Sequence, residues 1–250
     1  FFGDEHGDQM HLLFDVIGNQ ALYLALVRGD ARPLARSLRQ RPPTPPTGQW
    51  ANFVKNHDEQ SLDKLTDPER EEVFAAFAPD ESMRLYGRGI RRRFPSMVEG
   101  DRARMELAYS LCFSLPGTPV LFYGEEIGMG DDQSQEGRNA VRTAMQWTAD
   151  ENAGFSIAPR PSIPRPPIDK GRFGYRRVNV ERQRERPGSF LSWMARLIRT
   201  RREWPEFGWG ALSLLPAGED ALLAHRLEWR DGEVLAVHNL GGRKASARLR

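Results

Sequence analysis

Three short runs of almost continuously apolar residues stand out along the chain. They cover Met10–Phe14, Trp50–Val54 and Pro119–Tyr123. Runs of this length that lack polar alternation are typical of strands buried on both faces, as in a parallel sheet. Each run is followed by polar or glycine-rich residues, which favour the end of a strand. The pattern therefore predicts three buried strands.

Helical periodicity alternates with these runs. Apolar side chains recur at helical spacing over Gln20–Val27, and Gly29 is suited to end that helix. Asp101–Ser114 begins with an N-capping residue, and so does Ser189–Arg202, which Pro205 bounds. Strands and helices in this alternating order indicate parallel β/α units.

The pattern changes after about residue 206. Three strands are expected there, over Ala211–Leu215, Ala221–Trp229 and Glu233–Asn239. Arg230–Gly232 has the composition of a hairpin turn, and residues 245–250 have that of a further strand. We therefore expect two parts, 1–206 and 207–250, of which the second begins a small antiparallel domain.

Two segments lack apolar periodicity. Arg41–Gly48 contains four prolines, and Ile157–Gly188 is rich in proline and in basic residues. From residue 160 to residue 186 there are nine basic and three acidic residues. A nucleic-acid-binding arm is one interpretation, but only Phe173 and Tyr175 could stack on bases there. We favour a solvated insertion.

The amino-acid composition argues against several classes of protein. With 36 basic and 34 acidic residues the net charge is +2, which argues against a dedicated nucleic-acid binder. The single cysteine, Cys112, excludes an internal disulfide, suits a reducing, cytoplasmic compartment, and lies in an apolar run that favours a buried hydrophobe over a nucleophile. No apolar run is long enough to span a membrane, and no signal peptide opens the chain.

The motif Asn56–Glu59, Asn-His-Asp-Glu, directly follows the second apolar run. The carboxyl ends of the strands line the active site in a parallel β/α barrel, so a carboxylate beside a histidine is well placed there to face a sugar. Taken alone, the motif also suits a polar turn that caps the next element.

Three more motifs follow in the order Leu115–Met129, Val141–Trp147 and Asn152–Ser156. Together with Asn56–Glu59 they resemble the distal part of the α-amylase family, glycoside hydrolase family 13, and within it the trehalose synthase and α-glucosidase branch. Ala144 stands where this family usually has proline. Val178–Gln183, followed by Ser189–Arg202, is similar to the last barrel helix of that branch.

The resemblance implies an α/β fold. The chain would be the C-terminal part of a (β/α)8 TIM barrel, strands six to eight with their helices, followed by the start of an antiparallel β-sandwich domain. The nucleophile and the general acid of this family come from the fourth and fifth strands, and would lie upstream of residue 1. Three of eight strands cannot close a barrel, so we expect the isolated chain to be inactive and prone to aggregate.

The resemblance also implies residue roles. Asp58 is the expected catalytic carboxylate that holds hydroxyls of the reacting glucose and stabilises the oxocarbenium-like transition state. His57 would hydrogen-bond the same sugar, and Glu59 would reach the leaving-group sugar. Arg142 would close the pocket behind the non-reducing glucose, or form a buried ion pair that ties down the loop after the eighth strand, or do both.

Glu125 and Glu126 also follow a predicted strand. A carboxylate pair in that position invites a general-acid role, but the family pattern implies a structural role for this loop, which we favour. The segment has no glycine-rich phosphate loop and no metal-ligand spacing. We expect no cofactor in it, and any calcium site would lie upstream.

Three functions remain open. The preferred one is rearrangement of maltose to trehalose by a retaining glucosyl transfer. The second is a hydrolytic α-glucosidase or α-amylase, in which water attacks the covalent intermediate. The third is a family member without catalysis that acts as a binding or partner subunit. The expected ligand is a small α-glucoside such as maltose, without nucleic acid or membrane as a partner.

Overall fold

The computed structural model describes residues 1–4 and 6–247. A parallel sheet is formed by β1 (Leu12–Phe14), β2 (Gln49–Phe53) and β6 (Thr118–Val120), in the order β1-β2-β6. Ala51 of β2 pairs with Phe14 on one side and with Thr118 on the other. The prediction of three strands is confirmed, although the pairing starts later in β1 and ends earlier in β6 than the apolar runs.

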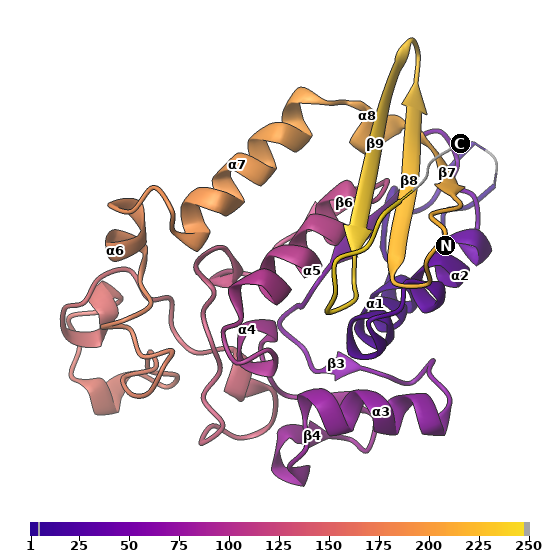
Figure 1. The fold of residues 1–250 in the computed structure, drawn as a ribbon. Coiled ribbons are helices and arrows are strands. Elements are labelled where there is room, and N and C mark those ends of the chain that lie inside the picture. The colour runs from indigo at the N-terminus through magenta and orange to yellow at the C-terminus, as the bar shows by residue number, and fades with distance from the viewer. Residues whose placement is uncertain (5, 248–250) are drawn as a thin grey trace.

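Helices cover one face of this sheet. Both α1 (Val16–Arg28) and α5 (Arg102–Ser114) contact β2 (Figure 1). Asp101 caps α5 through the Arg104 amide at 3.1 Å, as predicted. Gly29 ends α1 in the left-handed conformation, at φ 62°, which glycine adopts without steric cost.

The start of α1 and the whole of α2 were not predicted. Helix α1 begins four residues ahead of the expected range, and Asp15 caps it by accepting from the Gly18 amide at 2.9 Å. The next helix, α2 (Arg32–Gln40), buries only three side chains, those of Leu34, Ala35 and Leu38. Three of its six other positions are arginines, and three apolar side chains are too few to show a helical period.

The opposite face of β1 is open. The side chains of Leu12 and Phe14, two residues apart on the same strand, are 47% and 49% exposed. Side chains two apart lie on one face of a strand. The described residues therefore leave this side of the edge strand β1 uncovered, whereas Ala51 and Phe53 of β2 are buried.

A small unit between β2 and α5 was not predicted. It contains three two-residue strands, β3 (Gln60–Ser61), β4 (Arg84–Leu85) and β5 (Gly89–Ile90), paired antiparallel in the order β3-β5-β4. It also contains α3 (Asp67–Phe77) and α4 (Phe94–Met97). Strands this short show no alternation, so a sequence pattern cannot reveal them.

Residues 157–188 are more ordered than the solvated insertion that the sequence predicts. They contain the helix α6 (Val180–Arg184), and they bury Ile163, Tyr175 and Asn179. The Asn179 side chain caps α6 through the Arg182 amide at 2.8 Å and donates to the Tyr175 carbonyl at 2.7 Å. Many of its residues are exposed, as expected of a solvated insertion, but these buried side chains tie the segment to the body.

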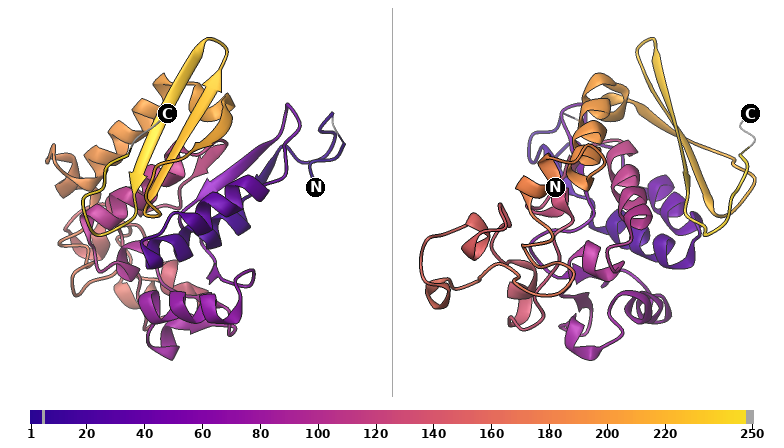
Figure 2. Two further views of the ribbon diagram at one scale, coloured as in Figure 1. Left: turned by 45° about the vertical axis from the view of Figure 1, so that its right-hand side comes forward. Right: turned by 60° about the vertical axis from the view of Figure 1, so that its left-hand side comes forward.

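The C-terminal elements follow the prediction. Ser189 caps α7 (Phe190–Glu203), and α8 (Glu206–Trp209) leads into an antiparallel meander. The strands of this meander are β7 (Ala211–Leu215), β8 (Leu222–Trp229) and β9 (Gly232–Asn239). Figure 2 shows β8 and β9 as a long hairpin along one side of the molecule.

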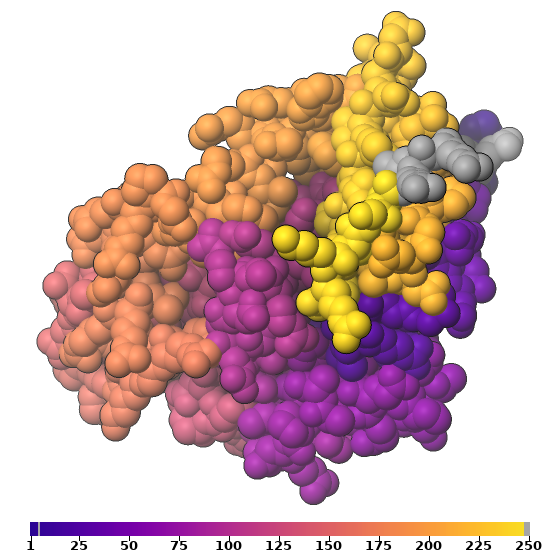
Figure 3. Space-filling view, viewed as in Figure 1, coloured from indigo at the N-terminus to yellow at the C-terminus, as the bar shows by residue number. Residues whose placement is uncertain are grey.

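The meander packs on the helices rather than standing free. Leu223 and Leu240 belong to the same hydrophobic core as α1 and α5, and the yellow C-terminal segment lies against the body in the space-filling view (Figure 3). Residues 245–247 are not in a strand, so that part of the prediction for 245–250 was wrong. Residues 248–250 lie outside the described residues.

Candidate functional site

The loop after β2 is folded around a buried lysine. Lys55 is almost completely buried, and its Nζ donates to the carbonyl of Asn56 at 3.0 Å and to that of Asp58. The Asn56 Oδ1 in turn accepts from the Asp58 amide at 2.9 Å. These bonds hold the backbone of the motif, while His57 and Asp58 keep partly exposed side chains. Burial lowers the pKa of Lys55 to about 7.

Two guanidinium groups face one oxygen of Asp58. Arg142 Nη2 lies 2.9 Å and Arg138 Nη1 lies 3.1 Å from Asp58 Oδ1, and His57 Nε2 lies 3.7 Å from the same atom. The Asp58 side chain is still 36% exposed. The carboxylate is therefore oriented by protein charges and also accessible to a ligand.

Arg142 connects two loops that are far apart in the sequence. It follows the short helical turn Gly137–Val141, and its Nε donates to the His57 carbonyl at 2.8 Å. The structure therefore brings Asp58, His57 and Arg142 together. Arg142 forms an ion pair with Asp58, and this pair is partly exposed rather than buried as expected. The contact of Arg142 with a sugar stays a prediction.

Glu59 is turned toward a different partner. Its side chain is only 7% exposed, and its Oε2 accepts from Arg138 Nε at 2.6 Å. The expected contact of Glu59 with a leaving-group sugar is untested, and it would compete with this pairing. Arg138 was not singled out from the sequence, although it lies four residues before Arg142 and both arginines face the acidic motif.

A buried carboxylate lies behind the site. Glu125 Oε1 accepts from the Tyr109 hydroxyl at 2.8 Å, and its Oε2 accepts from the Phe122 amide at 2.8 Å. Burial raises the pKa of Glu125 to about 7. Both oxygens are engaged within the protein, which supports the structural role expected for this residue.

Arg93 ties the loop after β6 to the turn that precedes Arg142. It is fully buried, donates to the Tyr123 carbonyl at 2.7 Å and to the Val141 carbonyl at 2.9 Å, and lies over the Phe122 ring at 4.5 Å. A guanidinium has five N–H donors in a rigid fork, so it can join two loops at once. It was not recognised from the sequence, because its partners are backbone atoms 30 and 48 residues away.

A hollow of about 440 Å³ adjoins Arg142. Its lining includes the aromatic side chains of Tyr123, Trp147 and Phe155 together with the carboxyl group of Glu126. Apolar ring faces next to a few charged groups are typical of small-molecule sites. This mixture suits a sugar, which presents both C–H faces and hydroxyl groups.

Residues 1–4 and 6–247 contain neither a metal site nor a membrane-spanning helix. No three side chains of the His, Cys, Asp and Glu types lie together as a metal site there. None of the helices described has the length and apolar character needed to span a bilayer.

The chain is similar in sequence to one known catalytic domain and to known trehalose synthases. Residues 90–210 match the catalytic domain of alpha amylase. Trehalose synthase from Thermus thermophilus is 42% identical over 241 residues, which are 96% of this chain and 25% of that protein. Trehalose synthase/amylase TreS from Mycobacterium tuberculosis is 40% identical over 245 residues, which are 96% of this chain and 41% of that protein.

A solved structure gives the same result at the level of the fold. Alpha-amylase from H. orenii superposes with a TM-score of 0.65 at 20% identity, over 92% of this chain and 39% of that one. The chain thus spans between a quarter and about two fifths of the length of these relatives. On these matches, which cover nearly its whole length, the chain belongs to the α-amylase family, glycoside hydrolase family 13.

Proposed function

We propose that this chain forms the distal part of an enzyme that rearranges maltose to trehalose by a retaining glucosyl transfer. The observation that carries the proposal is the Asp58 carboxylate, which is held by two arginines at the carboxyl end of β2 and stays accessible. The sequence identities of 42% and 40% to two trehalose synthases support the same reaction.

Each site residue has a role in this proposal. Asp58 accepts hydrogen bonds from hydroxyls of the reacting glucose, and its negative charge stabilises the positive charge of the oxocarbenium-like transition state. His57 donates to the same sugar. Arg142 orients Asp58 and closes the pocket behind the non-reducing glucose, whereas Glu59 reaches the leaving-group sugar once a ligand competes with Arg138.

The proposal places the chain within a larger barrel. Strands β1, β2 and β6 would be the sixth, seventh and eighth strands of a (β/α)8 barrel, and β7–β9 would begin an antiparallel domain after residue 206. The nucleophile and the general acid would come from strands upstream of residue 1, as would any calcium site. The open apolar face at Leu12 and Phe14 supports this placement, because an inner barrel face needs further strands to cover it.

A hydrolytic enzyme is the second candidate. The mycobacterial relative is named a trehalose synthase/amylase, and in a hydrolase the same Asp58 and Arg142 would stabilise the same transition state. The two reactions differ in whether glucose or water attacks the covalent intermediate. The difference therefore depends on how well the closed pocket excludes water.

The test is product analysis with maltose. The full-length protein is incubated with maltose, the products are separated by chromatography, and the isolated 250-residue chain is run in parallel. Trehalose with little free glucose is the expected result, and mostly glucose would establish the hydrolase instead. Absence of turnover by the full-length protein would overturn both, and robust turnover by the isolated chain would refute the upstream placement of the nucleophile and acid.

A further inference from the structure

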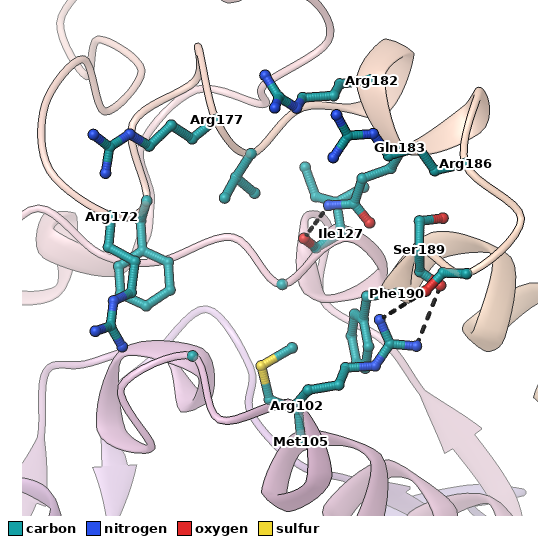
Figure 4. A pocket seen from close by; sticks show the side chains of 15 residues that line it. Arg102, Met105, Ile127, Arg172, Arg177, Arg182, Gln183, Arg186, Ser189 and Phe190 are labelled. Atoms are coloured by element: carbon teal, nitrogen blue, oxygen red, sulfur yellow. Dashed lines mark hydrogen bonds between the residues drawn. The ribbon is translucent and has the colours of Figure 1, made fainter.

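A second cavity, of about 490 Å³, is lined by arginines (Figure 4). It lies between the start of α5, the turn after β6 and the segment from residue 172 to residue 190. The arginines in its lining are Arg102, Arg172, Arg177, Arg182 and Arg186. No aspartate or glutamate lines it. It shares no lining residue with the hollow beside Arg142.

One of the five arginines is used within the protein. Arg102 Nε lies 2.5 Å from Glu106 Oε1, and its guanidinium also donates to the Ser189 carbonyl at 3.3 Å. It lies over the ring of Phe190, 5.1 Å from the centroid. Its charge is therefore balanced, and it acts as part of the cavity wall.

The other four guanidinium groups have no partner. Within residues 1–4 and 6–247, Arg172, Arg177, Arg182 and Arg186 form neither an ion pair nor a side-chain hydrogen bond. The acidic residues Glu181 and Glu185 of the same segment are not paired with them. All four side chains are exposed, so the rim of the cavity carries four positive charges that have no counter-charge among the described residues. An anion bound between them would be attracted to all four.

The wall that carries two of these arginines is fixed in place. Gln183, on α6, donates to the Ile127 carbonyl at 2.7 Å and accepts from the Leu191 amide at 3.0 Å. Arg182 precedes Gln183 on α6, and Arg186 lies two residues beyond the end of that helix. Because α6 is anchored to the turn after β6 and the Arg186 amide donates to the Gln183 carbonyl, the backbone that carries both arginines has a defined position beside the hollow.

The rest of the lining is apolar. Met105, Ile127, Phe173 and Phe190 form part of the wall. A cavity of this size can hold a small organic molecule. Planar guanidinium groups pair with phosphate oxygens through two parallel hydrogen bonds, and four of them match a ligand that carries several negative charges rather than one.

We propose that this cavity binds a small molecule that carries a diphosphate or a longer phosphate chain. The phosphate oxygens contact Arg172, Arg177, Arg182 and Arg186, and the uncharged part of the ligand lies on the apolar wall. The site is separate from the glucoside site, and the proposal does not depend on the proposed reaction.

Isothermal titration calorimetry of the full-length protein with inorganic triphosphate tests the proposal. We expect saturable binding that R182Q/R186Q weakens by at least about tenfold, because the variant removes two charge-assisted contacts to the phosphate oxygens. R172Q/R177Q removes the same charge from the other side of the cavity and should weaken binding similarly. The matched control is R176Q/R184Q, which alters two exposed arginines of the same segment outside the lining.

Three results would overturn the proposal. They are no binding of triphosphate, equal weakening by the control variant, and equal competition by sulfate at the same ionic strength, which would mean an adventitious ion only. Tighter binding of a single-stranded RNA with the same loss in R182Q/R186Q would assign the arginines to nucleic acid instead. Maltose turnover is measured separately, so failure of this proposal and failure of the proposed reaction are distinguishable.

Discussion

At the scale of single residues, the site depends on charges buried behind it. Lys55 holds the backbone of the loop that presents Asp58, and Glu125 anchors the loop after β6. Burial lowers the pKa of Lys55 to about 7 and raises the pKa of Glu125 to about 7. The exposed carboxylate of Asp58 is the one that has room to meet a ligand, and the buried groups set its position.

Replacing Asp58 by asparagine should lower kcat of the full-length protein on maltose by about 100-fold or more. The amide keeps the size of the side chain but removes the charge that faces the transition state. Steady-state kinetics measures the effect, and D231N, in the exposed turn between β8 and β9, is the matched control. A D58N enzyme within threefold of the wild-type kcat would contradict the role given to Asp58.

Replacing Glu125 by glutamine should destabilise the protein without abolishing turnover. The new amide nitrogen cannot accept the bond from Tyr109 or from the Phe122 amide, and one unsatisfied buried group costs about 1–3 kcal/mol. Urea unfolding and maltose turnover are compared for the same preparations. A loss of turnover above 100-fold at unchanged stability would instead make Glu125 a general acid.

At the scale of elements, α7 holds the C-terminal end of α5. Arg201 donates to the carbonyls of Leu115 at 3.2 Å and of Phe207 at 2.8 Å, and also to those of Phe113 and Gly117. The last carbonyls of a helix have no partner within the helix. One guanidinium therefore satisfies the end of α5 and joins it to α7 and to the segment before β6.

Replacing Arg201 by methionine should lower the free energy of unfolding by about 2–4 kcal/mol. Methionine fills similar space but leaves several carbonyls without a donor, and bonds to a charged group contribute about 1.5–3 kcal/mol each. The control R199M changes an exposed arginine of the same helix and should cost less than about 0.5 kcal/mol. Equal midpoints of urea unfolding for the two variants would refute the capping role.

At the scale of the whole molecule, two histidines join the antiparallel meander to α5. His225 Nε2 lies 2.9 Å from the Ser114 carbonyl, and His238 Nε2 lies 2.9 Å from the Ser110 hydroxyl. The two rings are stacked, with centroids 6.0 Å apart. Both rings are buried, and neither Nδ1 has a hydrogen-bond partner in the part of the chain that the structure describes.

This contact should weaken in acid. Burial, and then the neighbouring His225, lower the pKa of His238 to about 4, below the value of about 6.5 in an unfolded chain. The unfolded state thus binds more protons between these values, so stability is lost as the pH falls through this window. From pH 6.5 to pH 4.5 the loss from His238 is about 2 kcal/mol.

The variant H238Q isolates the loss of stability that protonation of His238 causes. Other groups also titrate over the same range, so the measurement compares the change in unfolding free energy between pH 6.5 and pH 4.5 in the two proteins. The change should be smaller in H238Q by about 2 kcal/mol. An equal change in both proteins would show that protonation of His238 does not control the contact.

Much of the framework follows from local sequence. The three apolar runs predicted β1, β2 and β6, and the capping residues Asp101 and Ser189 marked the starts of α5 and α7. These features depend on side chains a few residues apart, so the sequence alone determines them. The order of the motifs likewise identified the family and pointed to Asp58, His57 and Arg142.

Other features depend on contacts that only the folded chain makes. Arg138 meets Glu59 across 79 residues, and the hydrogen bond from Arg93 to Val141 spans 48. The burial of Lys55, the short strands of the sheet β3-β5-β4 and the arginine-lined cavity are of the same kind. No local pattern encodes them, because burial and charge pairing are set by which distant segments pack together. The sequence by itself thus determined the strands, the caps and the motif, whereas the tertiary structure decided which charges are paired and which are left for a ligand.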